Sequence, residues 1–224
     1  MIPIRDTIPS RHTPWIVRSL IAANVGLFIF EWMQGPNLEA FLYRFGLVPA
    51  HWDLLSLGEW FRMPNPATAL VTSQFLHGGI AHLGFNMLYL WIFGDNVEDR
   101  LGPARFLALY LGSGIAAGLT QFAVQPSSAV PMIGASGAIA GVLGAYFLLF
   151  PYARIVTLLP LLITWEFIEL PAFVFLGLWF VLQWFQGLSS LGQLTSVGGV
   201  AFWAHVGGFV SGLLLVGRLK SPRR

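Results

Sequence analysis

Four polar side chains that could take part in catalysis stand in otherwise apolar stretches of this sequence: Ser136, His205, and the pair His82 and Asn86. A serine hydroxyl becomes a nucleophile only when a neighbouring base takes its proton, and His205 is the candidate base. The amide of Asn86 and the imidazole of His82 are suitable donors for an oxyanion. The alternative for Ser136 is simple packing, because its neighbours in GASGAIAG (134–141) are small.

The composition is that of a membrane protein. Of the 224 residues, 56% are hydrophobic and 10% are charged, whereas soluble domains carry about 25% charged residues. The chain has no cysteine, which excludes disulfides and thiol chemistry, and its net charge of +2 gives no footprint for nucleic acid. The start of the chain is polar and shows no signal peptide, so the first apolar run is expected to remain as an anchor.

Six apolar segments approach the length of about 20 residues that a membrane-spanning helix needs. They are approximately 16–33, 79–97, 104–124, 135–151, 170–187 and 201–219. We therefore predict an all-α fold of six transmembrane helices in one compact bundle, forming a single membrane domain over 1–224.

The remaining segments are expected to be connections. Residues 1–15 form an N-terminal segment, 34–78 a long first loop with its aromatic residues partly in the membrane interface, and 220–224 a basic tail. The apolar stretch 155–165 is too short to span, and it is expected to be an interfacial connector.

Lysine and arginine set the predicted orientation. With both termini in the cytoplasm, ten of the twelve basic residues lie on the cytoplasmic side, and only Arg44 and Arg62 lie outside, in the long first loop. This distribution follows the positive-inside rule. The outer loops 125–134 and 187–200 carry no charge.

The same topology brings the polar residues to one depth. The second, fourth and sixth spans run in the same direction, and His82, Ser136 and His205 each lie near the start of one of them. At about 1.5 Å per residue, all three fall in the outer third of the bilayer. Asp95, Glu98 and Asp99 fall at the opposite end of the second span, so no carboxylate is expected at this level and the site would be a Ser–His dyad.

Small residues line the two spans that carry the dyad. Ser136, Ala140 and Gly144 share one face of the fourth span, and His205, Gly208 and Gly212 share one face of the sixth. Such stripes let membrane helices approach closely. If the two stripes face each other, Ser136 meets His205.

At these residues the sequence resembles the rhomboid family of intramembrane serine proteases. The matching stretches are GASG (134–137), AHVGGFVSG (204–212), HGGIAHLGFN (77–86), FGDNVEDRLG (93–102) and WFR (60–62). Each motif is weak alone, but together, in order and in the expected spans, they are specific.

The resemblance implies a nucleophile at Ser136, a base at His205, and oxyanion donors at Asn86, His82 and the Ser136 amide. It also implies that the substrates are transmembrane segments of other proteins, cut near their outer ends in the cytoplasmic membrane of a prokaryotic cell. Substrates would enter sideways past a gate, for which Phe85, Trp184 and Phe185 are the candidates.

Two functions other than proteolysis are also compatible with a small polytopic membrane protein. A catalytically inactive rhomboid-like protein that binds transmembrane segments is the alternative, although such proteins usually lack the serine or the histidine. A transporter or channel is disfavoured because the sequence shows no internal repeat. We expect no cofactor and no metal, since His82 and His205 have no carboxylate or thiolate partner. The expected partners are membrane lipid and transmembrane protein substrates, with no nucleic acid.

Overall fold

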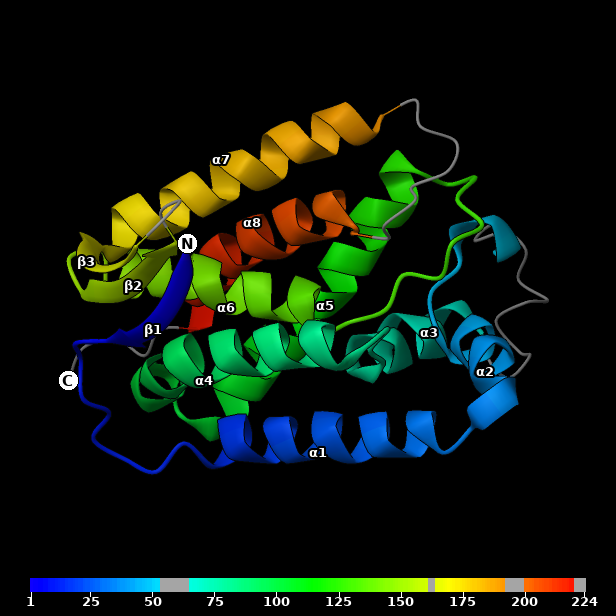
Figure 1. Cartoon of the computed structure of the whole chain (residues 1–224), viewed down its shortest axis with the longest axis horizontal. Coiled ribbons are helices and arrows are strands. Elements are labelled where there is room, and N and C mark those ends of the chain that lie inside the picture. Colours follow the sequence, from blue (N-terminus) through cyan, green and yellow to red (C-terminus); the bar gives the residue numbers. More distant parts are fainter. Residues whose placement is uncertain (53–64, 161–163, 192–199, 220–224) are drawn as a thin grey trace.

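The most enclosed element is helix α6 (Ser136–Leu149), in which every residue from Gly137 to Tyr146 is buried. The computed structural model describes residues 1–52, 65–160, 164–191 and 200–219. In it, helices α4, α5, α7 and α8 all pack against α6 (Figure 1). A helix that other helices enclose is apolar on all sides, and α6, which is 14 residues long, fits this pattern.

In the described part of the chain, six long helices form where six were predicted, with bounds that differ by a few residues. They are α1 (Trp15–Trp32), α4 (Ile80–Leu101), α5 (Pro103–Val124), α6, α7 (Ala172–Ser190) and α8 (Phe202–Leu219). Four of them, α1, α5, α7 and α8, are long and apolar enough to cross a membrane. Helix α6 is shorter, and α4 has polar side chains along its length, at His82, Asn86, Asp95 and Asn96.

The two ends of the bundle are named here by the segments that lie there. The end that holds Ile2–Asp6, Arg154 and Leu219 is called the terminal end, and the opposite end, where α4, α6 and α8 begin, is called the site end (Figure 1).

The long first link is folded at the site end. Its described parts form short helices: η1 (Gly35–Asn37), α2 (Leu38–Phe45), η2 (Pro49–His51), α3 (Pro66–Thr72) and η4 (Ser73–Phe75). Leu47 exchanges two backbone hydrogen bonds with Met132 (3.1 and 2.7 Å), which joins this link to the loop before α6. The motif Trp60 to Arg62 lies outside the described residues.

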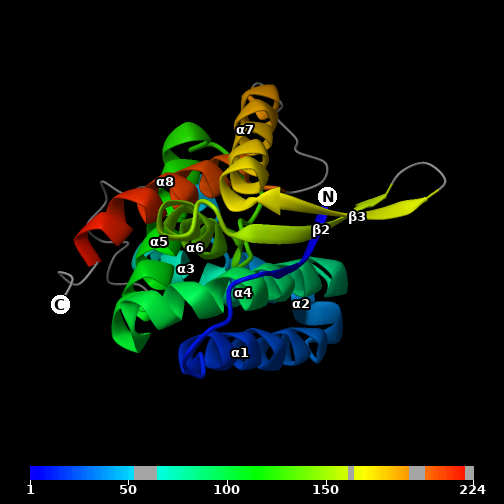
Figure 2. The same ribbon diagram turned by 90° about the vertical axis from the view of Figure 1, so that its left-hand side faces the viewer.

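The prediction of helices alone was wrong at the terminal end. Strands β1 (Ile2–Asp6), β2 (Arg154–Pro160) and β3 (Trp165–Pro171) form an antiparallel sheet in the order β1-β2-β3. The stretch 155–165, expected to be an interfacial connector, therefore belongs mostly to a hairpin, which projects beyond the helices in Figure 2. Ile155 and Thr157 alternate into the core, the pattern of a half-buried strand.

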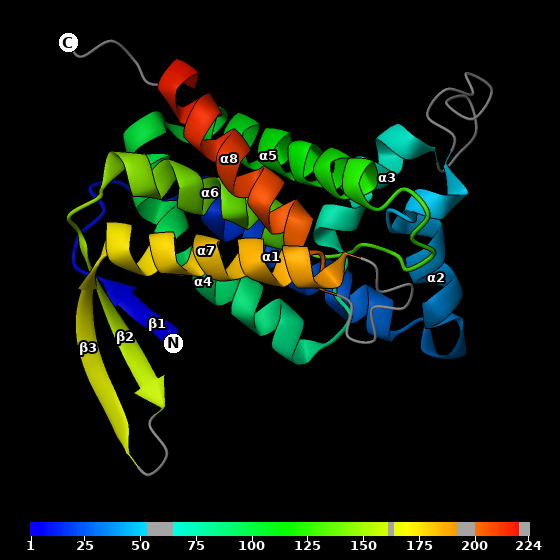
Figure 3. The same ribbon diagram turned by 90° about the horizontal axis from the view of Figure 1, so that it is seen from above.

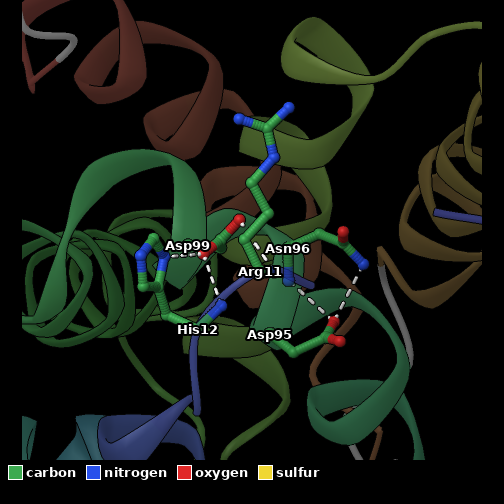
Figure 4. A network of polar contacts seen from close by, with 5 residues as sticks. All are labelled: Arg11, His12, Asp95, Asn96 and Asp99. Carbon is green, nitrogen blue, oxygen red and sulfur yellow. Dashed lines mark hydrogen bonds and ion pairs between the residues drawn. The ribbon is translucent and has the colours of Figure 1, made fainter. Parts of the chain in front are cut away.

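Acidic residues in the last turns of α4 hold the N-terminal segment. Glu98 accepts hydrogen bonds from the backbone N–H groups of Ile16 (3.0 Å) and Val17 (2.9 Å), which have no partners within α1. Asp99 accepts from the Nδ1 and backbone N–H of His12 and from the backbone N–H of Arg11, whose guanidinium points away (Figure 4). These bonds fix the start of α1 against α4.

Helices α6 and α8 touch through their backbones. A Cβ atom at Gly208 would lie 2.1 Å from the Gly137 carbonyl oxygen, and one at Gly212 would lie 2.0 Å from that of Gly141. A Cβ at Gly144 would lie 2.2 Å from the Phe209 oxygen. The predicted contact of the two small-residue faces is therefore present, and Gly137 and Gly141 belong to it as well.

We expect Gly212→Ala to lower the melting temperature of the protein in detergent. The added methyl group meets backbone atoms of Gly141 and can be accommodated only by separating α8 from α6, and overpacking of this kind costs about 1–3 kcal/mol. The matched control is Gly217→Ala in the same helix, where nothing lies within 4 Å of the new methyl group. Equal melting temperatures for the two variants would contradict the proposed tight contact.

Candidate active site

Ser136 and His205 meet at the site end. Ser136 is the first residue of α6, and His205 lies in the first turn of α8. The Nε2 atom of His205 lies 2.8 Å from the Oγ atom of Ser136, a hydrogen-bond distance. The contact expected from the small-residue faces is thus formed, and it is geometrically suited to proton transfer from the hydroxyl to the imidazole.

The other ring nitrogen of His205 is also occupied. Its Nδ1 atom lies 2.7 Å from the Oε1 atom of Gln183 on α7. The Trp179 ring, also on α7, lies over the imidazole with a centroid distance of 5.8 Å. Neither residue was predicted from the sequence, although Gln183 gave a signal as a polar residue inside an apolar span.

His82 and Asn86 lie on neighbouring turns of α4 and face the start of α6. A Cβ at Gly134 would lie 2.7 Å from the Cε1 and Nε2 atoms of His82 and 3.7 Å from the Nδ2 atom of Asn86. Gly134 has a φ angle of +120°, which a side chain rarely tolerates, so glycine allows this approach. The loop is pinned by the hydrogen bond from the Gly134 N–H to the Ser73 oxygen (2.9 Å).

The Nδ2 atom of Asn86 is buried and has no hydrogen-bond partner among the described residues. Leaving a buried donor unsatisfied costs about 1–3 kcal/mol, so such a group calls for an explanation. The backbone N–H of Ser136, at the start of α6, also has no hydrogen-bond acceptor among the described residues, as expected in the first turn of a helix.

A cavity of about 840 Å³ connects these groups. Its lining includes Ser136, His205, His82 and Asn86, which brings all four candidates of the sequence analysis to one space. Helices α4 and α7 diverge toward this end in two perpendicular views (Figures 1 and 3), and both contribute aromatic residues to the lining, Phe85 and Tyr89 from α4 and Trp179 from α7.

The three gate candidates lie in different surroundings. Phe85 lines the cavity and is 52% exposed. Trp184 packs against Trp203 of α8, with ring centroids 5.3 Å apart, and Phe185 is 61% exposed on α7. Neither Trp184 nor Phe185 is among the residues that line the cavity.

One buried carboxylate does lie at the site end, contrary to expectation. Glu31, in the last turn of α1, is buried and accepts a hydrogen bond from the backbone N–H of His77 (3.1 Å). Its described contact is thus with the loop before α4 and not with His205. Burial, together with the nearby His82, lowers the pKa of His77 to about 4, so His77 is neutral near pH 7.

The sequence is similar to those of known proteins of one family. Residues 58–221 match the model of the Rhomboid domain. The chain is 46% identical over 118 residues to rhomboid protease GluP of Bacillus subtilis and 37% identical over 121 residues to the putative rhomboid protease YdcA of the same organism. These matches cover 53% and 49% of the chain.

A third relative matches over most of the chain. Rhomboid protein 1, mitochondrial, of Saccharomyces cerevisiae is 28% identical over 207 residues, which is 91% of the chain. The matches cover 21% of GluP, 57% of YdcA and 53% of the yeast protein, so the chain spans little more than half of their length at most. The family model covers well over half of the chain, and the chain therefore belongs to the rhomboid family.

Proposed function

We propose that this protein is an intramembrane serine endopeptidase that cleaves transmembrane segments of other membrane proteins. The observation that carries the proposal is the 2.8 Å contact between Ser136 Oγ and His205 Nε2, at the edge of a cavity, in a chain whose relatives include named rhomboid proteases. Ser136 is the proposed nucleophile and His205 the proposed base.

In the first half of the reaction, the Ser136 oxygen attacks the carbonyl carbon of the scissile peptide bond. The hydroxyl proton passes to Nε2 of His205 as the new C–O bond forms, and the carbonyl electron pair moves onto its oxygen. When the carbonyl re-forms, the C–N bond breaks and His205 returns the proton to the leaving amine. An acyl group is then held on Ser136.

In the second half, a water molecule attacks the acyl carbon. Its proton passes to His205 and then to Ser136, and the new carboxyl terminus leaves. The cavity is large enough to admit a peptide segment and a water molecule, and it reaches the polar groups of the proposed dyad.

The negative oxygen of each tetrahedral intermediate requires hydrogen-bond donors. The buried Nδ2 of Asn86 and the backbone N–H of Ser136 are donors without described partners, and His82 lies beside them. A donor held in place before the reaction does not need to reorganise when the charge develops, which is why such groups lower barriers. We assign the three groups to an oxyanion site.

The proposal places all six long helices across the membrane, with both termini in the cytoplasm, because ten basic residues then lie inside. The proposed site opens toward the outer side, and the membrane is the cytoplasmic membrane of a cell. A substrate helix would enter from the lipid between α4 and α7, past Phe85 and the exposed aromatic face of α7 at Trp184 and Phe185.

Cleavage of a model substrate tests the proposal. Purified protein in detergent, incubated with a single-span membrane protein, is expected to produce two fragments, and Ser136→Ala is expected to produce none, since the nucleophilic oxygen is missing. Electrophoresis and mass spectrometry of the fragments measure both. If the variant and the unaltered protein give the same result over several substrates, the protein binds transmembrane segments without cutting them or has another role.

The rate of cleavage should depend on pH through one group of the proposed dyad. An imidazolium cannot accept the Ser136 proton, so kcat/KM is expected to fall at acid pH as His205 becomes protonated. The pKa of His77, lowered to about 4 by burial, keeps that second imidazole neutral near pH 7. A kcat/KM that stays constant over the whole acid range in which the protein remains folded would contradict the role of His205.

Truncation of the proposed oxyanion donor should slow the chemical step. We expect Asn86→Ala to reduce kcat by about 10²–10³-fold with little change in KM, the usual effect of losing one such donor. Asn24→Ala is the control, since Asn24 is also a buried asparagine but lies on α1, bonded to the Leu20 oxygen (2.7 Å). Equal kcat values for the two variants would remove Asn86 from the site.

A further inference from the structure

Helix α7 carries one inward-facing polar side chain, Gln183, in a stretch whose other side chains are apolar and exposed. Val181, Leu182, Trp184 and Phe185 of α7 are all exposed, whereas Gln183 between them is half-buried. Its Oε1 atom lies 2.7 Å from Nδ1 of His205. Polar side chains are costly within a membrane and are usually retained for a defined partner. Here the described partner is the proposed base.

This contact decides where the proton of the imidazole sits. An amide oxygen accepts hydrogen bonds and cannot donate them, so the bond to Oε1 requires the proton of a neutral His205 to be on Nδ1. The Nε2 atom then carries a lone pair, and at 2.8 Å it can accept the hydrogen of Ser136 Oγ. With the opposite tautomer, Nε2 would present a proton to Ser136 and could not act as a base.

The position of Gln183 is fixed by a second contact between α7 and α8. The indole Nε1 of Trp203 donates a hydrogen bond to the Gly187 oxygen (3.1 Å), and a Cβ at Gly187 would lie 3.2 Å from that ring. Gly187 is one turn along α7 from Gln183, and Trp203 is two residues before His205. The site-end portions of α7 and α8 lie side by side in Figures 1 and 3, which agrees with this register.

We propose that Gln183 is a positioning residue that holds His205 in the tautomer and orientation needed to accept the Ser136 proton. This inference rests on the proposed protease function. It adds a third member to the dyad, supplied by α7, which is also a wall of the proposed substrate entrance. His205 can therefore act as a base only when α7 is packed against α8.

The test compares Gln183→Ala with Gln186→Ala, a change of the same residue type three positions along the same helix. Without the amide, His205 is free to adopt the unproductive tautomer and to rotate, so Gln183→Ala is expected to lower kcat by about 10–100-fold, part of what a general base contributes. KM should stay within about twofold, because Gln183 is not expected to touch substrate. Gln186→Ala should leave both constants unchanged.

A second variant separates positioning from structural support. In Gln183→Glu a carboxylate can still accept a hydrogen bond from the Nδ1–H group of His205, so kcat should be well above that of Gln183→Ala. The negative charge should also raise the pKa of the facing imidazole by about 1–3 units and move the acid limb of kcat/KM to higher pH. The limb would stay in place only if side chain 183 did not face the imidazole, and the recovery of kcat then distinguishes positioning of the ring from structural support.

The rate at which a fluorophosphonate labels Ser136 provides a readout that needs no substrate, and it should follow the same order of variants. The inference is overturned if Gln183→Ala keeps kcat and labelling within about twofold of Gln186→Ala, or if Gln183→Glu leaves the acid limb unmoved. If Gln183→Ala has a lowered melting temperature, the inference is judged instead from the acid limb of kcat/KM in Gln183→Glu. Failure of the protease function would be seen differently, as equal behaviour of the unaltered protein and Ser136→Ala.

Discussion

The backbone contact between α6 and α8 is the constraint on which the rest of the site depends. Gly208 and Gly212 approach the carbonyl oxygens of Gly137 and Gly141 so closely that no side chain fits between them. In lipid, helices are not driven together by the hydrophobic effect, and close packing of backbones takes its place. Because Ser136 begins one helix and His205 lies in the first turn of the other, this packing also sets their 2.8 Å separation.

Polar groups at the two ends of the bundle have different roles: some stabilise the fold, and others are proposed to take part in catalysis. At the terminal end, the carboxylates of Glu98 and Asp99 find backbone partners in the N-terminal segment and stabilise the start of α1. At the site end, Asn86 keeps a buried donor with no described partner beside an open cavity. Satisfied groups contribute to stability, whereas an unsatisfied donor beside a cavity can form a hydrogen bond with a group that enters it.

Much of the helix bundle and of the site could be predicted because a membrane restricts which structures a chain can adopt. Helix length, the distribution of basic residues and the shared depth of His82, Ser136 and His205 led to the bundle and to the contact of the dyad. The sheet could not be predicted, since β2 pairs with Ile2–Asp6, about 150 residues away, and a short apolar stretch looks the same in a connector and in a strand. Gln183 could not be singled out because α7 carries a second glutamine, Gln186, and its apolar residues lie on every side of the helix, so the sequence does not show which glutamine faces α8.

The identity of this third residue matters for a site inside a membrane. A buried carboxylate would stabilise an imidazolium more strongly than an amide, but it would carry a desolvation cost that an amide avoids. An amide oxygen still selects the tautomer, because it can only accept. On the proposed function, α7 thus offers His205 orientation without charge, and the bond from Trp203 to Gly187 sets the register of α7 and α8 that brings Gln183 to the base.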